Sequence, residues 1–347
     1  MLFSCQKSKP VVGSNVVMKA IFLLSCLLGL VMLAAEPAAA ASEPRFGMPD
    51  QQTARATAER VYNTWRLAMT RGDESAWRSS TTRSRQNKVR NLIVSQKGDF
   101  PDDFFRNQPE PPSLDKFQYI GCMTGCRHHT LSATYVGKVK LGDARSSDTA
   151  FVLLFVFEDG KWKFDQSRMF NLARLPKVKE RLLRGEVAVL QEQDGFHPYE
   201  EIPAVPAVCP APQLIGKVFV DAPGRHIDMK INGISVHQFS DERRADVISG
   251  GLRRGRNTIS YTISTDEKLE HPSMAIGLFV MPETPGNHPV CVFDHILDAT
   301  DTAKGGEFRF DISNEFIASM NPRFTGKAPQ PFHAVPLKEK PGKATSR

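Results

Sequence analysis

The chain has 347 residues, with 45 Lys and Arg against 38 Asp and Glu, which leaves a formal net charge of +7. Hydrophobic residues make up 41% and charged residues 24%, proportions typical of a globular protein, so a wholly disordered or fibrous chain is excluded. Domains usually contain about 100–200 residues, and the length therefore predicts two of them. The single long apolar segment lies at the N-terminus, which excludes a polytopic membrane protein.

A secretory leader is predicted over residues 1–41. Lys19 precedes an apolar run over residues 20–35, and a run of alanines over residues 38–41 follows it. A basic flank, a short apolar core and small residues at a cleavage site define a signal peptide. We therefore expect export to the periplasm or the extracellular space, with cleavage near Ala41.

Two other interpretations of the leader stay open, an uncleaved anchor and a lipoprotein attached at Cys26. The apolar run continues past Cys26, which favours the signal peptide. The start is either Met1 or Met18, because Met18-Lys19 opens a compact leader by itself.

Two basic stretches, residues 83–90 and 174–184, each fall on a predicted amphipathic helix whose other face is apolar. A charge run of this kind is usually a solvated helix face. A nucleic-acid binder would need its surplus positive charge clustered on one surface. We expect no nucleic-acid partner, and no membrane contact after the leader is removed.

Three helices are predicted over residues 53–97. Apolar residues recur at every third or fourth position of the first helix, which predicts one buried stripe. Gly72 should end that helix, because glycine adopts the left-handed cap conformation at little cost, and Asp73 should cap the second. The third should stop near Gly98, before a proline-rich loop over residues 99–115.

Antiparallel strands are predicted next. Residues 116–122 and 131–139 alternate between apolar and polar side chains, whereas residues 151–157 are apolar throughout. A continuously apolar strand should be covered on both faces, by the second domain or by another copy of the chain. A homodimer through this sheet face is therefore one candidate assembly. Asp159-Gly160 is a favoured turn pair for the hairpin that follows.

This order of helices and strands resembles exported NTF2-like proteins of unknown function. The resemblance covers about residues 45–170 and rests on the helix pair around Trp65 and on the segment 155–164. It implies an α+β cone, in which three helices pack on a curved antiparallel sheet that leaves a pocket at its open end. Trp65, Tyr119 and Tyr135 are the candidate pocket residues.

From Leu214 to about Ile312 the pattern is all β. Seven short apolar runs are separated by turn signals, which predicts a C-terminal β-sandwich. The stretches 231–234 and 251–259 resemble galactose-binding-type jelly rolls. The predicted organisation is a signal peptide (1–41), an NTF2-like domain (45–185), a proline-rich linker (186–212), a β-sandwich (213–316) and a disordered tail (317–347).

Four cysteines remain after cleavage of the leader. An even count in an exported chain predicts two disulfides, although four cysteines allow three pairings. Proximity and domain membership favour Cys122–Cys126 and Cys209–Cys291.

Two clusters raise the question of a metal site. Cys122, Cys126, His128 and His129 could nominally supply four zinc ligands, but their spacing is not that of a zinc finger and neighbouring strand residues face opposite ways. A calcium site would need a loop motif that the second cluster lacks. We therefore expect no metal and no cofactor. The second cluster comprises Asp294, His295, Asp298 and Asp301.

No catalytic residues are assigned. Acid–base catalysis in a cone pocket needs a carboxylate beside a tyrosine. Asp165 is the obvious acid, but it shares the strand parity of Lys161 and Lys163 and should face outward, away from the pocket. The expected protein is thus not an enzyme but an exported two-domain protein that binds a ligand or a protein partner in the cell envelope.

Two alternative functions stay open. One is a small-molecule isomerase or dehydratase that uses the pocket. The other is a carbohydrate-binding module in the sandwich, although that region has no Trp and only one Tyr, Tyr261, with which to stack on a sugar.

Overall fold

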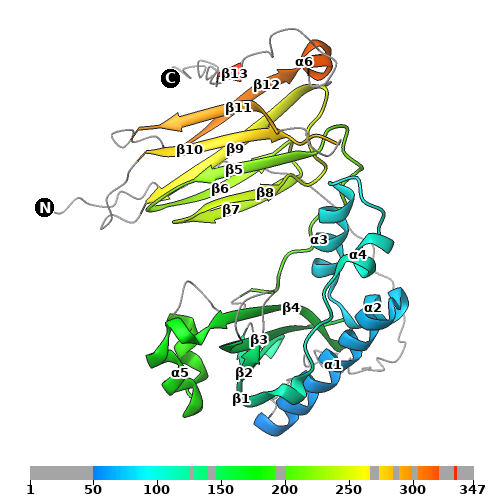
Figure 1. The fold of residues 1–347 in the computed structure, drawn as a ribbon, viewed down its shortest axis with the longest axis vertical. Helices are drawn as coiled ribbons and strands as arrows, with labels where there is room; N and C mark the ends of the chain where they lie inside the picture. Colours follow the sequence, from blue (N-terminus) through cyan, green and yellow to red (C-terminus); the bar gives the residue numbers. More distant parts are fainter. Residues whose placement is uncertain are drawn as a thin grey trace, which may run out of the picture. The chain divides into compact units, whose positions relative to one another are not determined.

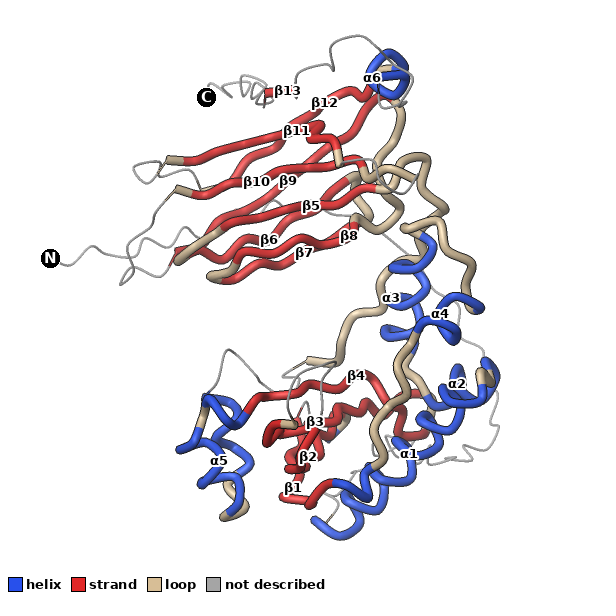
Figure 2. The backbone as a smooth tube through the Cα atoms, viewed as in Figure 1, coloured by secondary structure: helices blue, strands red, loops and turns tan. Residues whose placement is uncertain are grey.

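The computed structural model describes residues 50–125, 128–139, 146–192, 201–265, 273–283, 289–298, 304–319 and 332–333. The predicted signal peptide and most of the predicted tail lie outside these ranges. Within them, no helix has the length and apolar character needed to cross a membrane. Figure 2 shows that strands dominate the described backbone.

The first sheet has four antiparallel strands that follow one another in chain order (Figure 1). Asp159 and Gly160, both at positive φ, form the tight turn between the last two strands that the sequence predicts. The third strand is buried from Thr149 to Val156, which confirms that both of its faces are covered. The strands are β1 (Phe117–Gly125), β2 (Thr130–Val139), β3 (Ser147–Glu158) and β4 (Lys161–Asn171).

Helix α1 (Gln51–Arg71) packs on one face of this sheet. Its buried residues recur every three or four positions, as a single apolar stripe requires. Gly72 ends the helix with a φ of 65°, and Asp73 caps the next one by accepting a hydrogen bond from Ala76 N at 2.9 Å, both as predicted. The stripe meets aromatic side chains of the sheet, namely Tyr135, Phe151, Phe155 and Phe164.

Short helices from the same chain cover the opposite face. Leu182 and Leu190 pack against Val152 and Leu154 of β3 in one aliphatic cluster. The sequence suggested a second domain or a second copy of the chain for this role, but the segment that directly follows β4 fills it. That segment comprises η3 (Leu172–Arg174), α5 (Pro176–Leu183) and η4 (Val187–Glu192).

Two further helices contact the sheet at its edge strand, β4. Helices α2 (Glu74–Ser80) and α3 (Arg83–Val94) contact β4, and α2 shares a separate cluster around Trp77 with the end of α1. Helix α4 (Asp102–Asn107) joins the same cluster and lies where the sequence predicted only a loop.

The predicted fold class, an α+β cone plus a jelly-roll-like sandwich, is therefore wrong. The described part of the chain is mostly β, with three sheets and no layer of three helices packed on any of them. The reason lies in α3, whose buried residues are Ser84, Val89 and Asn91. A helix that buries polar side chains has no apolar stripe with which to cover a sheet.

Helix α3 instead binds part of the proline-rich segment that the sequence predicted as a linker. Asn91 Nδ2 donates to Ala207 O at 2.8 Å, and Asn91 Oδ1 accepts from Cys209 N at 3.0 Å. Buried amide groups need such partners, so the polar residues of α3 are satisfied by this backbone. Ser84 and Asn87 donate in the same way to the carbonyls of Ala204 and Pro206.

The remaining strands form two sheets that share one apolar core. One sheet has the order β13-β11-β10-β5-β8 and the other β12-β9-β6-β7. Asn232 and Gly233, both at positive φ, make the hairpin turn between β6 and β7. The bounds are β5 (Gly216–Asp221), β6 (Arg225–Ile231), β7 (Ser235–Ser240), β8 (Arg243–Val247), β9 (Gly255–Thr265), β10 (Met274–Val280), β11 (Val290–Leu297), β12 (Gly305–Ile312), α6 (Asn314–Ser319) and β13 (Phe332–His333).

Candidate functional site

A cavity of about 590 Å³ lies beside α1. Tyr62, Trp65 and Met69 line it from that helix, because spacings of three and four positions place them on one helix face. Trp77 from α2 and Phe151 from β3 extend the aromatic wall. We call this space the aromatic cavity. Its further lining residues are Arg85, Phe104, Gln108, Pro109, Glu110, Pro111, Pro112, Lys116, Phe117, Lys138, Val139, Ser167 and Met169.

The loop over residues 108–112 forms one wall of the aromatic cavity and is tied to α1. The Tyr62 hydroxyl donates to Pro112 O at 2.8 Å, and Arg66 Nε donates to Pro111 O at 2.9 Å. Arg66 also pairs with Glu110 at 2.6 Å. A loop held by three bonds to one helix gives the cavity a preformed wall.

Two indole N–H groups of the lining have no hydrogen-bond partner within the described chain. Trp77 is 0% exposed, and its Nε1 is unpaired. Trp65 Nε1 is likewise buried and unpaired. A buried donor without a partner costs about 1–3 kcal/mol, so most buried donors in folded proteins have one. Both nitrogen atoms are buried, so these unpaired donors lie within the packed wall and not on the accessible surface of the cavity.

The charged residues of the lining are mostly basic. Arg85, Lys116 and Lys138 contribute to the wall, and the single acid there, Glu110, is paired with Arg66. Charges of one sign around a low-dielectric hollow raise the local concentration of the opposite ion. The cavity is therefore electrostatically suited to an anion.

Proton-transfer groups in the lining are already engaged. Burial raises the pKa of Tyr62 well above its usual range, so the phenol stays protonated and acts as the donor to Pro112 O. Glu110 is held in its ion pair with Arg66. The cavity wall thus offers hydrogen-bond donors and apolar rings rather than a free acid or base.

The three predicted pocket residues do not lie in one site. Trp65 lines the aromatic cavity, whereas Tyr119 and Tyr135 do not belong to its lining. The Tyr119 hydroxyl donates to Gln51 Oε1 at 3.2 Å near the start of α1, and the Arg55 guanidinium lies 4.9 Å from the Tyr119 ring.

The rings of Tyr119 and Tyr135 lie 5.5 Å apart, and burial raises the pKa of both phenols. Within the described residues, the hydroxyl of Tyr135 has no hydrogen-bond partner. The enzyme hypothesis required a carboxylate bonded to one of these phenols, and neither phenol is bonded to one in the described chain.

Lys163 and Asp165, which were predicted to face outward, are buried, although neither lines the aromatic cavity. Asp165 is 2% exposed and accepts a hydrogen bond from Thr82 Oγ1. Lys163 is also buried and pairs with Glu158 at 2.9 Å. The pairing of β3 with β4 shifts register across Asp165, and this bulge breaks the simple alternation at that residue, whereas Lys163 lies in the regular part of the ladder, opposite Val156.

The predicted disulfides are not formed among the described cysteines. Cys209 and Cys291 are both free, with Cys209 Sγ 3.4 Å from Ser95 Oγ on the α3 side and Cys291 Sγ donating to Phe293 O at 3.3 Å. The extended 204–209 backbone places Cys209 against α3, which is why the Cys209–Cys291 pairing fails.

Cys122 is also free, and its thiol donates to Gln51 Oε1 at 3.2 Å. Its predicted partner, Cys126, lies outside the described residues. Burial raises the pKa of both the Cys122 and the Cys291 thiol, so neither is an activated nucleophile. Over the described ranges, no group of His, Cys, Asp and Glu is arranged to hold a metal ion.

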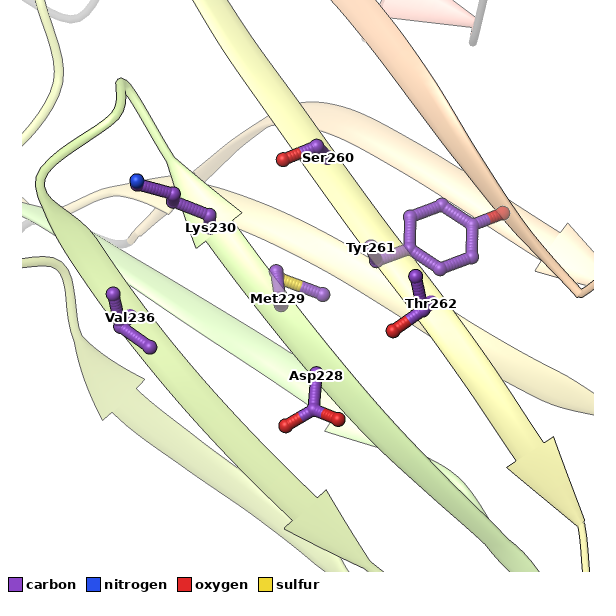
Figure 3. A pocket seen from close by; sticks show the side chains of 7 residues that line it. All are labelled: Asp228, Met229, Lys230, Val236, Ser260, Tyr261 and Thr262. Atoms are coloured by element: carbon purple, nitrogen blue, oxygen red, sulfur yellow. The ribbon is translucent and has the colours of Figure 1, made fainter. Parts of the chain in front are cut away.

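A shallower depression of about 210 Å³ lies on the sheet β12-β9-β6-β7 (Figure 3). Asp228 and Lys230 of β6 and Ser260 and Thr262 of β9 supply its polar side chains. Tyr261 is the one aromatic residue in its lining, but this side chain is 5% exposed and belongs to the core. The depression therefore lacks the exposed ring that a sugar stacks on.

Sequence reasoning missed a serine–histidine–aspartate chain at β7 and β8. Ser235 Oγ lies 2.7 Å from His237 Nε2, and His237 Nδ1 lies 3.4 Å from Asp246 Oδ2. The His237 bond lowers the pKa of Asp246, and Arg244 adds to that effect. Ser235 is buried and accepts from Ser249 N at 2.8 Å, so its hydroxyl is closed to a substrate. This series of hydrogen bonds instead links β7 and β8, which are edge strands of the two sheets.

Neither a family model, nor a curated protein, nor a solved structure matches this chain. The resemblances noted in the sequence therefore receive no support from these comparisons. A signal for the cavity did exist in the sequence, since Trp65 and Trp77 bracket Gly72 and Glu110 lies between Pro109 and the pair Pro111-Pro112, but it does not indicate that these segments meet.

Proposed function

We propose that the protein is a non-catalytic binding protein that takes up a small, mostly apolar molecule in the aromatic cavity. The observation that carries the proposal is the cavity itself, with its aromatic wall and its preformed loop over residues 108–112. A volume of about 590 Å³ falls within the range of about 300–1,000 Å³ usual for small-molecule sites.

Binding is favoured over catalysis by the state of the polar groups around the cavity. Tyr62 is neutral and bonded to backbone, and Glu110 is paired with Arg66. General acid–base chemistry would need a group of this kind free to exchange a proton with the ligand. The cavity wall instead supplies a defined shape, apolar surface and hydrogen-bond donors, and these are the features that ligand binding requires.

We further propose that the protein works outside the cytoplasm, with its leader removed near Ala41. The basic, apolar and small-residue parts of residues 1–41 support this location. N-terminal sequencing of the protein recovered from its native cells tests it, and a chain that begins at Met1 or Met18 would contradict it.

Binding is tested with the neutral dye N-phenyl-1-naphthylamine, whose fluorescence rises in apolar surroundings. Ser167 and Lys161 both lie exposed on β4, but only Ser167 lines the cavity. The variant Ser167→Trp should fill the hollow and weaken dye binding at least about tenfold, because an overpacked site excludes the ligand. The matched control Lys161→Trp should bind as the unmodified protein does. Equal dye binding by both variants, or none by the unmodified protein, would contradict the proposal.

A further inference from the structure

We propose that residues 108–112 form a strap over the aromatic cavity, and that Arg66 is the positioning residue that keeps this strap closed. By doing so, Arg66 controls how fast a ligand enters and leaves. The inference rests on the proposed function and adds the regulation of the same site. The strap contributes five consecutive residues to the cavity lining, whereas the rest of the lining comes from single residues or pairs.

The strap lies between the cavity and the solvent. Gln108, Pro109 and Glu110 all line the cavity, yet all three are exposed, and the side chain of Glu110 is 63% exposed. A single layer of chain therefore separates the hollow from water at this point. Displacing that layer opens the cavity and leaves α1 and the sheet in place.

The backbone of the strap has few attachments. Proline has no amide N–H, so Pro109, Pro111 and Pro112 cannot donate a backbone hydrogen bond. No backbone–backbone hydrogen bond joins residues 108–112 to another described residue. Segments without such bonds open at a lower free-energy cost than helices and strands do.

Side chains of α1 hold the strap instead. Arg66 makes two of the three bonds, from Nε to Pro111 O at 2.9 Å and from Nη2 to Glu110 Oε1 at 2.6 Å. The Tyr62 hydroxyl makes the third, to Pro112 O at 2.8 Å. Arg66 does not line the cavity, so replacing it releases the strap without replacing a residue that the ligand meets.

The two contacts of Arg66 should contribute unequally. The ion pair joins side chains that are 23% and 63% exposed, and water and salt weaken such a pair. The bond to Pro111 O is partly buried and has a charged donor, which strengthens it. We therefore expect the contact with Pro111 to hold the strap more firmly than the ion pair with Glu110.

The first test measures the binding kinetics of N-phenyl-1-naphthylamine by stopped-flow fluorescence. Arg66→Met removes both contacts and should raise the association and dissociation rate constants together, each at least about tenfold, because a hydrogen bond to a charged group contributes that much. The dissociation constant should stay within about threefold, since the closed strap covers the empty and the occupied cavity alike. The matched control is Arg60→Met, at an exposed arginine of α1 outside the lining, and it should change neither rate constant.

Two milder variants grade the effect. Glu110→Gln weakens only the ion pair and should change both rate constants by less than about threefold. Arg66→Lys keeps the positive charge but lacks the planar fork that reaches two acceptors at once, so its rate constants should fall between those of the unmodified protein and Arg66→Met. Circular dichroism verifies that each variant is folded, and Arg66→Lys carries the test if Arg66→Met is not.

The second test follows the strap without a bound ligand. Met69 lines the cavity and is 7% exposed, so the thiol introduced by Met69→Cys should react slowly with the neutral reagent N-phenylmaleimide while the strap is closed. Adding Arg66→Met should accelerate this labelling at least about tenfold, whereas adding Arg60→Met should not. Mass spectrometry of the peptide that contains position 69 separates this reaction from that of the native cysteines.

The outcomes separate this inference from the proposed function. Unchanged rate constants and unchanged labelling in Arg66→Met would show that residues 108–112 are a fixed wall, and would overturn the strap. Faster dissociation with unchanged association would overturn it too, because Arg66 would then stabilise the occupied cavity without controlling entry. If the dye does not bind but Arg66→Met accelerates labelling, the strap opens as inferred and the proposed function fails.

Discussion

The two faces of the four-stranded sheet differ in what covers them. On the α1 face, large rings such as Tyr62, Phe151 and Phe155 dominate, whereas the α5 face is built from smaller aliphatic residues such as Val152 and Leu182. Strand β3 contributes to both sets by simple alternation, with Phe151 and Phe155 on one face and Val152 on the other. The aromatic cavity lies on the first face only.

This difference in side-chain type explains why a cavity remains on one face of an otherwise packed domain. Branched aliphatic side chains interdigitate into gaps of almost any shape, whereas rigid rings meet edge to face and leave space where no ring fits. Here that space is lined by Trp65 and Trp77, whose buried indole N–H groups have no partner among the described residues. The face packed with rings therefore carries the proposed binding site, whereas the aliphatic face is closely packed.

The largest expected effect tests whether the α5 face is fully packed. Leu182→Ala should reduce the free energy of unfolding by about 2–5 kcal/mol, because Leu182 is 0% exposed and its removal opens a new cavity. Leu183→Ala is the matched control: its side chain is 48% exposed, so the change should stay within about 0.5 kcal/mol. Urea unfolding monitored by circular dichroism measures both. Similar losses in the two variants would show that the α5 face is not a packed layer.

A smaller effect is expected on the α1 face. Met69 is buried but lines the aromatic cavity, so part of its surface already meets empty space. Met69→Ala should therefore cost about 1–2 kcal/mol, less than the usual cost of truncating a buried Met. The same urea unfolding experiment measures it. A loss as large as that of Leu182→Ala would mean that the two faces are equally well packed and would break the comparison.

The smallest expected effect is a loss of α5 stability at acidic pH. Lys179 Nζ of α5 pairs with Asp148 Oδ2 at 2.6 Å, and this hydrogen bond holds the pKa of Asp148 below its ordinary value of 3.8. A carboxyl group with a depressed pKa stabilises the fold above its ordinary pKa, and that contribution is lost as the pH falls through the lower folded value. Hydrogen-exchange protection of the α5 amides should therefore weaken below pH 3.8.

The control for this effect is Asp148→Asn, which removes the titrating group and keeps the size of the side chain. Protection of α5 in that variant should be lower at neutral pH and should change less between neutral and acidic solution. If α5 in the unmodified protein keeps full protection in acid, the ion pair does not hold this helix on the sheet.

Local features were predictable because they depend on residues close together in the chain. The cap at Gly72, the capping carboxylate of Asp73 and the Asp159-Gly160 turn follow from the preferences of the residues themselves. The continuously apolar stretch in β3 likewise predicted burial on both faces. These features determine where individual helices and strands begin and end, but they say little about how those elements pack together.

The failures came from interactions between distant segments. Helix α3 looked like a third layer on the sheet, yet Asn91 is paired with a backbone more than a hundred residues later in the chain. The parity argument for Asp165 failed at a β-bulge that depends on the register with β3. The cysteine pairing failed because Cys209 is placed against α3.

The sequence by itself determined the caps, the tight turns and the doubly buried strand, since each is decided within a few residues by backbone preference and hydrophobic pattern. Only the tertiary structure decided that Trp65 and Trp77 would line one hollow, and that basic residues from α3, β2 and the segment before β1 would contribute to its wall. A cavity is the space left after distant elements have packed, and no local preference specifies that space.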